Sequence, residues 1–128
     1  MEKAKIYGHR KMIVWQNLDK IEKIVQTVVM KRLPKTDFQL RNQIDRSCGS
    51  SVANFIEGYY SGSIKEYTRF LGYSRRSLAE LQDWIRRSFY KSYIPEELYL
   101  QLDDFCIKTI YLINRLVYSL KAKLTIKK

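Results

Sequence analysis

Apolar side chains recur every three or four residues in four stretches of this sequence, which is the spacing of helices that bury one face. The pattern predicts helices over residues 11–33, 37–60, 64–91 and 95–122. No stretch alternates as a strand does, so the predicted fold class is all-α, an antiparallel up-down four-helix bundle in one domain over residues 1–128. The buried stripe of the first helix is expected to comprise Val14, Leu18, Ile21, Val25 and Val28.

The predicted helix ends carry specific signals. Pro34 cannot continue the first helix, and Asp37 is a favourable N-cap for the second. Ser63 and Glu66 have the spacing of a capping box, in which the Ser63 hydroxyl accepts from the Glu66 N–H and the Glu66 carboxylate accepts from the Ser63 N–H. Pro95 fits the first position of the fourth helix, and the basic tail KAKLTIKK is expected to fray.

Small residues make the second predicted helix slim in its middle. Small side chains let a neighbouring helix approach closely, so we expect a tight contact at Gly49, Ser50, Ser51 and Ala53. The two cysteines, Cys48 and Cys106, each lie within an apolar-periodic stretch. They are expected to be small buried side chains rather than a metal or redox pair.

The composition is that of a folded globular chain, with 45% apolar and 29% charged residues and only five Gly and two Pro. No apolar run approaches the roughly 20 residues that a membrane span needs. The N-terminal residues lack the apolar core of a signal peptide. The expectation is a cytoplasmic protein with no membrane partner.

Charge changes this picture, because 24 Lys and Arg stand against 13 Asp and Glu and give a formal net charge of +11. Such an excess bears on partners rather than on fold. Nucleic acid is the first partner to consider, although an acidic protein or an anionic membrane surface would suit the same charge. Both termini of an up-down bundle lie at one end, where these residues would converge: Lys3, Lys5, Arg10, Lys11, Lys121, Lys123, Lys127 and Lys128.

Further candidate nucleic-acid ligands lie on the two middle helices. They are Arg41, Arg46, Lys65, Arg69, Arg75, Arg76, Arg86 and Arg87. Glu80 and Asp83 share an outer helix face with four of these candidates, namely Lys65, Arg69, Arg76 and Arg87. That face could equally be an ordinary solvated surface with charge pairs. Trp84 lies off the apolar face and is a candidate interface anchor. Tyrosines can stack on bases or be buried at subunit contacts, and both alternatives are open for Tyr59, Tyr60, Tyr73, Tyr90 and Tyr93.

Asn54, Glu57 and Gly58 share one helix face and raise the question of a small active site. Glu57 could act as a general base, but that chemistry needs a second titratable group, a metal or a nucleophile nearby. The local sequence supplies little of that kind. In the structural interpretation, which we favour, Gly58 admits a neighbouring backbone, Glu57 pairs with a cation on an adjacent helix and Asn54 bonds a helix end.

The sequence offers no set of catalytic or metal-ligating residues. The only His is His9, in an N-terminal segment expected to be mobile, and the Arg-to-His spacing of helical-bundle ribonucleases is absent. Di-iron bundles need Glu-x-x-His pairs on facing helices, and no phosphate-binding loop or Ser/Cys–His arrangement is present. We therefore predict a protein that is not an enzyme, with no metal and no cofactor.

Several separated blocks resemble the four-helix-bundle family named for 23S rRNA intervening sequences. They are VWQNLDKI, FQLRNQIDRSCGSSVANFIEG and SIKEYTRFLGYSRRSLAEL, beside family patterns such as VWQKA, QIRRAxxSIxxNIAEG and SxKExxxFLxxAxGSLxEL. The resemblance covers about residues 11–120. The chain departs from the family pattern at Asp45, where Arg is usual, at Phe55, and at Tyr73 and Arg75, where small residues are usual.

This resemblance implies an up-down bundle that assembles as a homopentameric ring, and it supplies no catalytic residues. The family includes the accessory variability determinant of diversity-generating retroelements, a basic pentamer that associates with a reverse transcriptase and binds nucleic acid. A net charge of +11 favours that branch: a non-catalytic scaffold that binds RNA and a reverse transcriptase. The alternative is an rRNA intervening-sequence-type bundle that acts as a protein-binding adaptor ring without nucleic acid.

Overall fold

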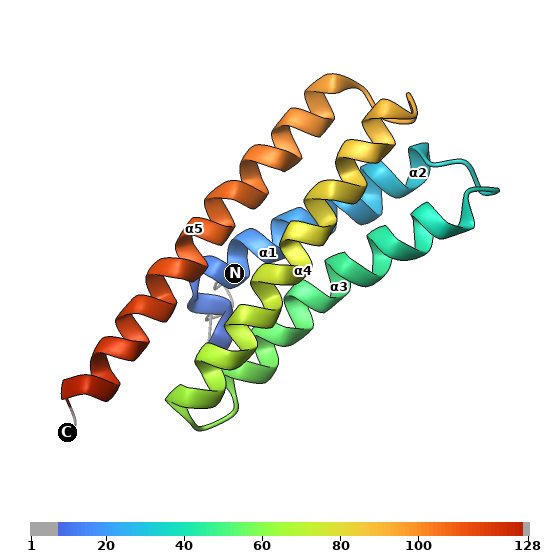
Figure 1. Cartoon of the computed structure of the whole chain (residues 1–128). Coiled ribbons are helices and arrows are strands. Elements are labelled where there is room, and N and C mark those ends of the chain that lie inside the picture. The colour runs from blue at the N-terminus through green and yellow to red at the C-terminus, as the bar shows by residue number, and fades with distance from the viewer. Residues whose placement is uncertain (1–7, 127–128) are drawn as a thin grey trace, which may run out of the picture.

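The structure of the chain, a computed structural model, describes residues 8–126, apart from the side chain of Ile126. α1, η2 and α2 form one continuous rod, so this part of the chain contains four long helices and no strand. Figure 1 shows the four running alternately up and down beside one another, which confirms the predicted all-α bundle. A ring-like oligomer stays a prediction. The elements are η1 (Gly8–Lys11, a 3-10 turn), α1 (Ile13–Ile24), η2 (Val25–Val29, π-helical), α2 (Met30–Arg32), α3 (Phe38–Tyr59), α4 (Ile64–Tyr90) and α5 (Glu96–Ile126).

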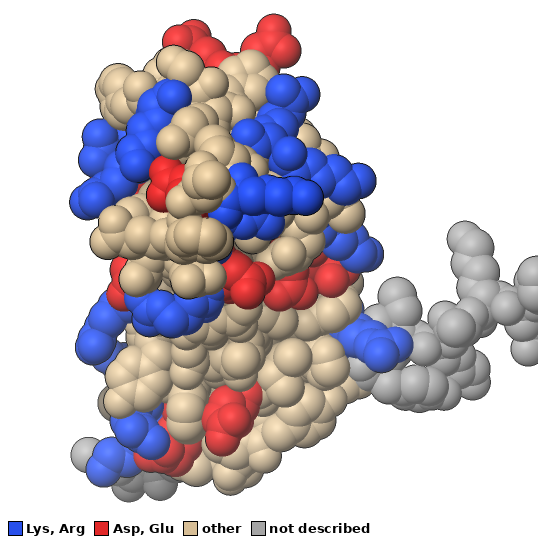
Figure 2. All heavy atoms as spheres, turned by 90° about the vertical axis from the view of Figure 1, so that its right-hand side faces the viewer, with Lys and Arg blue, Asp and Glu red and all other residues tan. Residues whose placement is uncertain are grey.

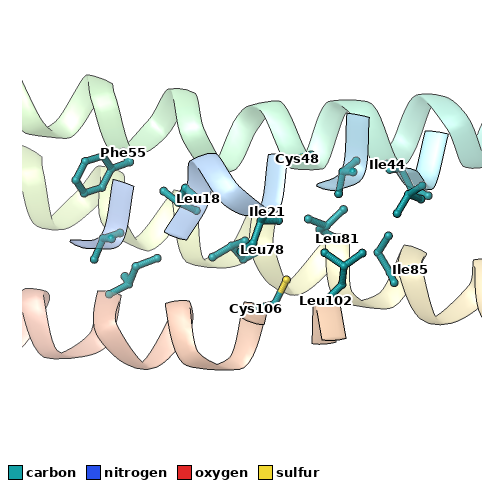
Figure 3. Packing of buried hydrophobic residues seen from close by; sticks show 14 of the residues in the cluster. Leu18, Ile21, Ile44, Cys48, Phe55, Leu78, Leu81, Ile85, Leu102 and Cys106 are labelled. Carbon is teal, nitrogen blue, oxygen red and sulfur yellow. The ribbon is translucent and has the colours of Figure 1, made fainter. Parts of the chain in front are cut away.

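The hydrophobic core lies between the four helices. Figure 3 shows Leu18 of α1, Phe55 of α3, Leu78 of α4 and Leu102 of α5 directed into this space. Burying one Leu or Phe side chain stabilises a fold by about 1.5–3 kcal/mol, so the shared core is what holds the helices together. In the last three helices the buried positions follow the apolar spacing of the sequence; they are Ile44, Cys48, Phe55, Leu71, Leu78, Leu81, Ile85, Leu98, Leu102, Cys106, Thr109, Ile113 and Leu120.

The predicted close contact of the second helix is made with α4. Ser51 and Ser74 are fully buried, and the Ser74 hydroxyl donates to the Ser51 carbonyl at 2.6 Å. Beside them, the hydroxyls of Ser50 and Ser77 are hydrogen-bonded at 2.9 Å. Because the hydroxyls of these four serines have partners, the helices approach closely here without leaving a serine hydroxyl unpaired. Gly49 takes no part, since a Cβ added there would meet nothing within 4 Å.

A π-helical turn changes which valine of the first rod is buried. Val28 was expected in the core, but it is 38% exposed, whereas Val29 is completely buried. A π turn holds one more residue than an α turn, and η2 therefore rotates the following residues around the axis. The buried positions continue from Val25 to Val29 and Leu33. Since Val28 and Val29 are both apolar, the pattern alone could not reveal this shift.

Asp37 and Arg41 fasten the end of the bundle where the loop through Pro34 meets the turn between α4 and α5, which we call the Pro34 end. Asp37 is the N-cap of α3, as predicted: its carboxylate accepts from the Leu40 N–H at 3.3 Å. The same carboxylate accepts from Lys91 Nζ at 3.1 Å. Arg41 donates to two carbonyls at the end of the first rod, which would otherwise lack partners.

Three predicted details of the helix ends are wrong. The Ser63 hydroxyl does accept from the Glu66 N–H, but Arg69 holds the Glu66 carboxylate at 2.6 Å, so it does not return to the Ser63 N–H. That N–H points to the Ser61 hydroxyl instead. Pro95 precedes α5, and the residues expected to fray continue this helix to Ile126.

The π turn predicts unequal costs for neighbouring substitutions. We expect Val29→Ala to lower the free energy of unfolding by about 2 kcal/mol, because it removes fully buried methyl groups. The matched Val28→Ala should change it by no more than about 0.5 kcal/mol. Chemical denaturation of both variants measures the difference. Equal losses would mean that the first rod continues as a regular α-helix.

The capping role of Asp37 predicts a dependence on pH. The Lys91 ammonium, hydrogen-bonded to this carboxylate, holds its pKa below the ordinary value of 3.8. A depressed pKa adds stability above the unfolded value, and this is lost as the pH falls through the folded pKa. We expect wild type to be more stable than Asp37→Asn at neutral pH, with the gap closing below pH 3.8. Thermal melts across pH test this; a constant gap would contradict it.

Candidate nucleic-acid interface

A groove at the Pro34 end separates the start of α3 from the last turns of α4. Its cavity volume is about 310 Å³. The two walls lie almost 50 residues apart in sequence and meet because antiparallel helices place the start of one beside the end of the next. We call it the Trp84 groove, and it is lined by Asp37, Gln39, Leu40, Trp84, Arg86, Arg87, Tyr90 and Lys91.

One carboxylate orders two of the cations in this groove. Asp83 accepts from Arg86 through one oxygen, at 2.8 Å, and from Arg87 Nε through the other, at 2.9 Å. The hydrogen bond from Arg86, with help from Arg87, holds the pKa of Asp83 below its ordinary range. The carboxylate therefore stays ionised at neutral pH, and it fixes both guanidinium groups while balancing only one of their charges.

Aromatic rings accompany the cations of the groove. The Arg87 guanidinium carbon lies 4.6 Å from the Trp84 ring centroid, and that of Arg86 lies 5.5 Å from the Tyr90 centroid. Both distances fall within the range of cation–π attraction. Tyr90 is 69% exposed, and Phe38, the first residue of α3, is 71% exposed. Rings this exposed leave a face open to a ligand.

More basic side chains surround the same end of the bundle. Lys31, Arg32 and Lys35 are exposed, and two of them line a second hollow with Arg41. Figure 2 shows Lys and Arg side chains gathered over the upper part of the face turned to the viewer, with acidic side chains in a band below and at the upper edge. The surface is thus mixed, with its cations concentrated at the height of the Pro34 end.

The sixteen basic candidates from the sequence are divided among several surfaces. Arg86 and Arg87 line the Trp84 groove, whereas Arg41 is occupied by backbone carbonyls. Arg46 lies near Glu80, and Arg75 donates to Asn114 of α5 at 2.6 Å. The other candidates on α4 lie in its first half: Lys65, Arg69 and Arg76.

The terminal candidates do not join this groove. Arg10 and Lys11 of η1 and Lys121 and Lys123 of α5 are exposed in the half of the bundle away from the Pro34 end (Figure 1). Lys3, Lys5, Lys127 and Lys128 lie outside the described residues. The expected convergence of all eight is therefore an untested prediction, and the concave basic site lies elsewhere.

Sequence reasoning missed Lys31, Arg32, Lys35 and Lys91 as members of a basic end. The signal was available in the topology, because an up-down bundle places the end of its first helix, the start of its second and the end of its third at one end. The groove itself could not be foreseen, since its shape depends on the rotation of α3 and α4 about their axes.

The cluster of Asn54, Glu57 and Gly58 does not converge on an active site. Asn54 donates to the Ser50 carbonyl at 2.8 Å, within its own helix rather than to a helix end. Glu57 is exposed and has no ion pair among residues 8–126. Gly58 is buried where a Cβ would lie 2.8 Å from the Phe70 Cβ. Of the three positions, only Gly58 serves the packing of α3 against α4, and the expected partners of Asn54 and Glu57 were wrong.

The groups with potential reactivity are held in structural roles. His9 was expected in a mobile segment, but its ring packs edge-on against Trp15 at 5.1 Å and its Nδ1 lies 3.0 Å from the Tyr60 hydroxyl. Burial raises the pKa of the Cys48 and Cys106 thiols to about 12, so neither is a thiolate at neutral pH. Within residues 8–126, no three His, Cys, Asp or Glu side chains lie together as metal ligands.

Fold and groove together define a helical-bundle protein with a groove at one end that is lined by cations and aromatic rings. The chain belongs to the 23S rRNA-intervening sequence protein family, whose model matches residues 10–115. This confirms the resemblance seen in the sequence.

The fold is also similar to a crystal structure of a protein with unknown function from the S23 ribosomal protein family of Bacteroides thetaiotaomicron VPI-5482. The two share 21% identity and a TM-score of 0.74, over 82% of this chain and 98% of that one. No curated protein sequence matches the chain. Over the described range, none of the helices is long and apolar enough to cross a membrane.

The packing of Gly58 predicts opposite effects for two Gly→Ala substitutions. Gly58→Ala should lower the free energy of unfolding by about 1–3 kcal/mol, since its methyl group would press on Phe70 and on the Tyr67 carbonyl. Gly49→Ala, the control in the same helix, should raise it by about 0.5–1 kcal/mol, because the site is open and Ala favours helix. Denaturant titration measures both. A stabilising Gly58→Ala would show that α3 and α4 are not in close contact here.

Proposed function

We propose that this chain is a non-catalytic scaffold that binds RNA through the Pro34 end and holds it beside a protein partner. The observation that carries the proposal is the Trp84 groove, in which Arg86, Arg87 and Lys91 stand beside two aromatic rings. Cations that neutralise phosphates supply most of the affinity for nucleic acid. The overall charge of +11 would draw RNA to the protein from a distance.

The family resemblance extends the proposal to the assembly. In a homopentameric ring the basic ends would be repeated about one axis, and five protomers of +11 each would carry about +55. A reverse transcriptase is the protein partner that the retroelement branch of the family implies. The scaffold would then act as the accessory subunit of a diversity-generating retroelement, bringing template RNA to the polymerase without performing chemistry itself.

A second function is favoured by an apolar surface on α5. Leu100, Ile107, Tyr111 and Tyr118 are all more than half exposed, and their spacings of seven and four place them along one side of the helix. A hollow of about 380 Å³ lies beside Tyr111 and Tyr118. Exposed apolar stripes of this kind suit protein contacts. The chain would then be a protein-binding adaptor ring without nucleic acid.

RNA binding can be tested by removing charge from one place only. We expect the wild-type chain to bind an end-labelled RNA hairpin, with an affinity that falls steeply between about 50 and 200 mM salt. The triple variant Arg86→Gln, Arg87→Gln and Lys91→Gln should bind at least tenfold more weakly and with a shallower salt slope. Fluorescence anisotropy across the salt series measures both quantities.

The control removes the same charge from α1 and α5, through Lys20→Gln, Lys23→Gln and Lys108→Gln. This control variant should lose no more than about threefold in affinity for RNA, because it lowers only the long-range attraction between the protein and the RNA phosphates. Light scattering on the same samples gives the number of protomers. Equal losses in the two triple variants would contradict a site at the Pro34 end. No binding even at low salt would contradict the RNA function and favour the adaptor.

A further inference from the structure

We propose that the Trp84 groove binds an unpaired base of single-stranded RNA, with the adjoining phosphates on Arg86, Arg87 and Lys91. This inference rests on the proposed RNA function and names the form of RNA that the site takes. It follows from three features of the groove: its size, its combination of rings and cations, and the way carboxylates hold the cations in place.

The size of the groove suits one nucleotide rather than a helix. Its volume of about 310 Å³ lies at the lower end of the range of roughly 300–1,000 Å³ typical of small-molecule sites. A double helix presents its phosphates on a convex surface and keeps its bases stacked inside, so it would span such a recess without entering it. A base that has left its stack can enter and contact the walls.

Two aromatic rings, those of Trp84 and Tyr90, line the groove where a base would enter it. Trp84 of α4 and Leu40 of α3 line the groove from its two sides; Trp84 is half-buried, whereas Tyr90 is 69% exposed. Aromatic rings and guanidinium planes are the groups on which proteins stack unpaired bases. Arg87 lies over the Trp84 ring at 4.6 Å, so a planar cation and an indole are already in contact in the site.

The cations are arranged so that donors stay available to phosphate. Arg87 gives only its Nε to Asp83 among the described residues, which leaves its two terminal nitrogens without an acceptor there. Arg86 uses Nε and one terminal nitrogen on the same carboxylate. Fixed guanidinium groups lose little conformational freedom on binding, and preorganisation of this kind favours affinity.

The one carboxylate in the lining is already engaged. Asp37 accepts from the Leu40 N–H, from Lys91 Nζ and from the Tyr93 hydroxyl, the last two at 3.1 Å each. The Lys91 ammonium balances the charge of the Asp37 carboxylate, so Arg86 and Arg87 leave the groove as a whole cationic. A phosphate near Lys91 would share that ammonium with Asp37.

The test compares three end-labelled RNAs of equal strand length: a single strand, its blunt duplex, and a single strand of abasic residues with the same phosphates. We expect the wild-type chain at physiological salt to bind the single strand at least tenfold more tightly than either of the others. Tyr90→Ala should weaken single-strand binding about tenfold, the order of one lost stacking contact, and leave duplex binding within twofold.

Two variants keep the result interpretable. Tyr90→Phe retains the ring and should bind as wild type does. Tyr60→Ala removes another exposed tyrosine, just after α3 at the end of the bundle away from the groove, and should change nothing. In a Trp15→Phe background, where Trp84 is the remaining tryptophan, the single strand should quench the fluorescence and the abasic strand should not.

The outcomes separate this inference from the proposed function. If all three RNAs bind with equal affinity, or if Tyr90→Ala weakens single strand and duplex alike, the groove is not a base site and the inference is overturned while RNA binding stands. If none of the three binds at low salt, both the inference and the proposed function are overturned.

Discussion

The close contact between α3 and α4 is the constraint on which the other features depend. Buried serines and Gly58 let the two helices approach, and the Ser74 hydroxyl bonds across the contact to the Ser51 carbonyl. Two antiparallel helices held this closely must present the start of one beside the end of the other. The Trp84 groove is the space left where α3 begins and α4 ends. Larger side chains at Ser51 or Gly58 would separate the helices and move both walls of the groove.

The charged residues at the Pro34 end both stabilise the helix ends and orient the cations on the surface. Asp37 caps α3 and ties it to Lys91 after α4, while Asp83 holds Arg86 and Arg87 along α4. Exposed ion pairs contribute little stability, typically between zero and about 1 kcal/mol. Their larger effect here is on order, because each carboxylate fixes the direction of a long cationic side chain. The acidic residues among these cations are therefore consistent with a binding surface.

The helices and most of the core could be predicted from the sequence, because apolar spacing records which side of each helix is buried. The failures have local physical causes. Val28 and Val29 are equally apolar, so the pattern could not locate the π turn, and Arg69 competes for Glu66 in a way that cap spacing does not encode. Arg86 and Arg87 were found as candidates by charge alone. The contact of Arg87 with Trp84 follows from their three-residue spacing on α4, but the position of both beside Asp37 depends on the angle between two helices, which a one-dimensional pattern does not contain.

The Trp84 groove and the apolar stripe of α5, which favour different functions, lie on different helices, so both could be occupied at once. The Trp84 groove is lined by residues from Asp37 to Leu40 and from Trp84 to Lys91, and it includes no residue of α5. The apolar stripe from Leu100 to Tyr118 lies wholly on α5. Burying that stripe against another copy or a polymerase would remove no wall of the groove. Under the proposed function, a single bundle would therefore make a protein contact and an RNA contact through separate surfaces, which is the arrangement that a scaffold between the two requires.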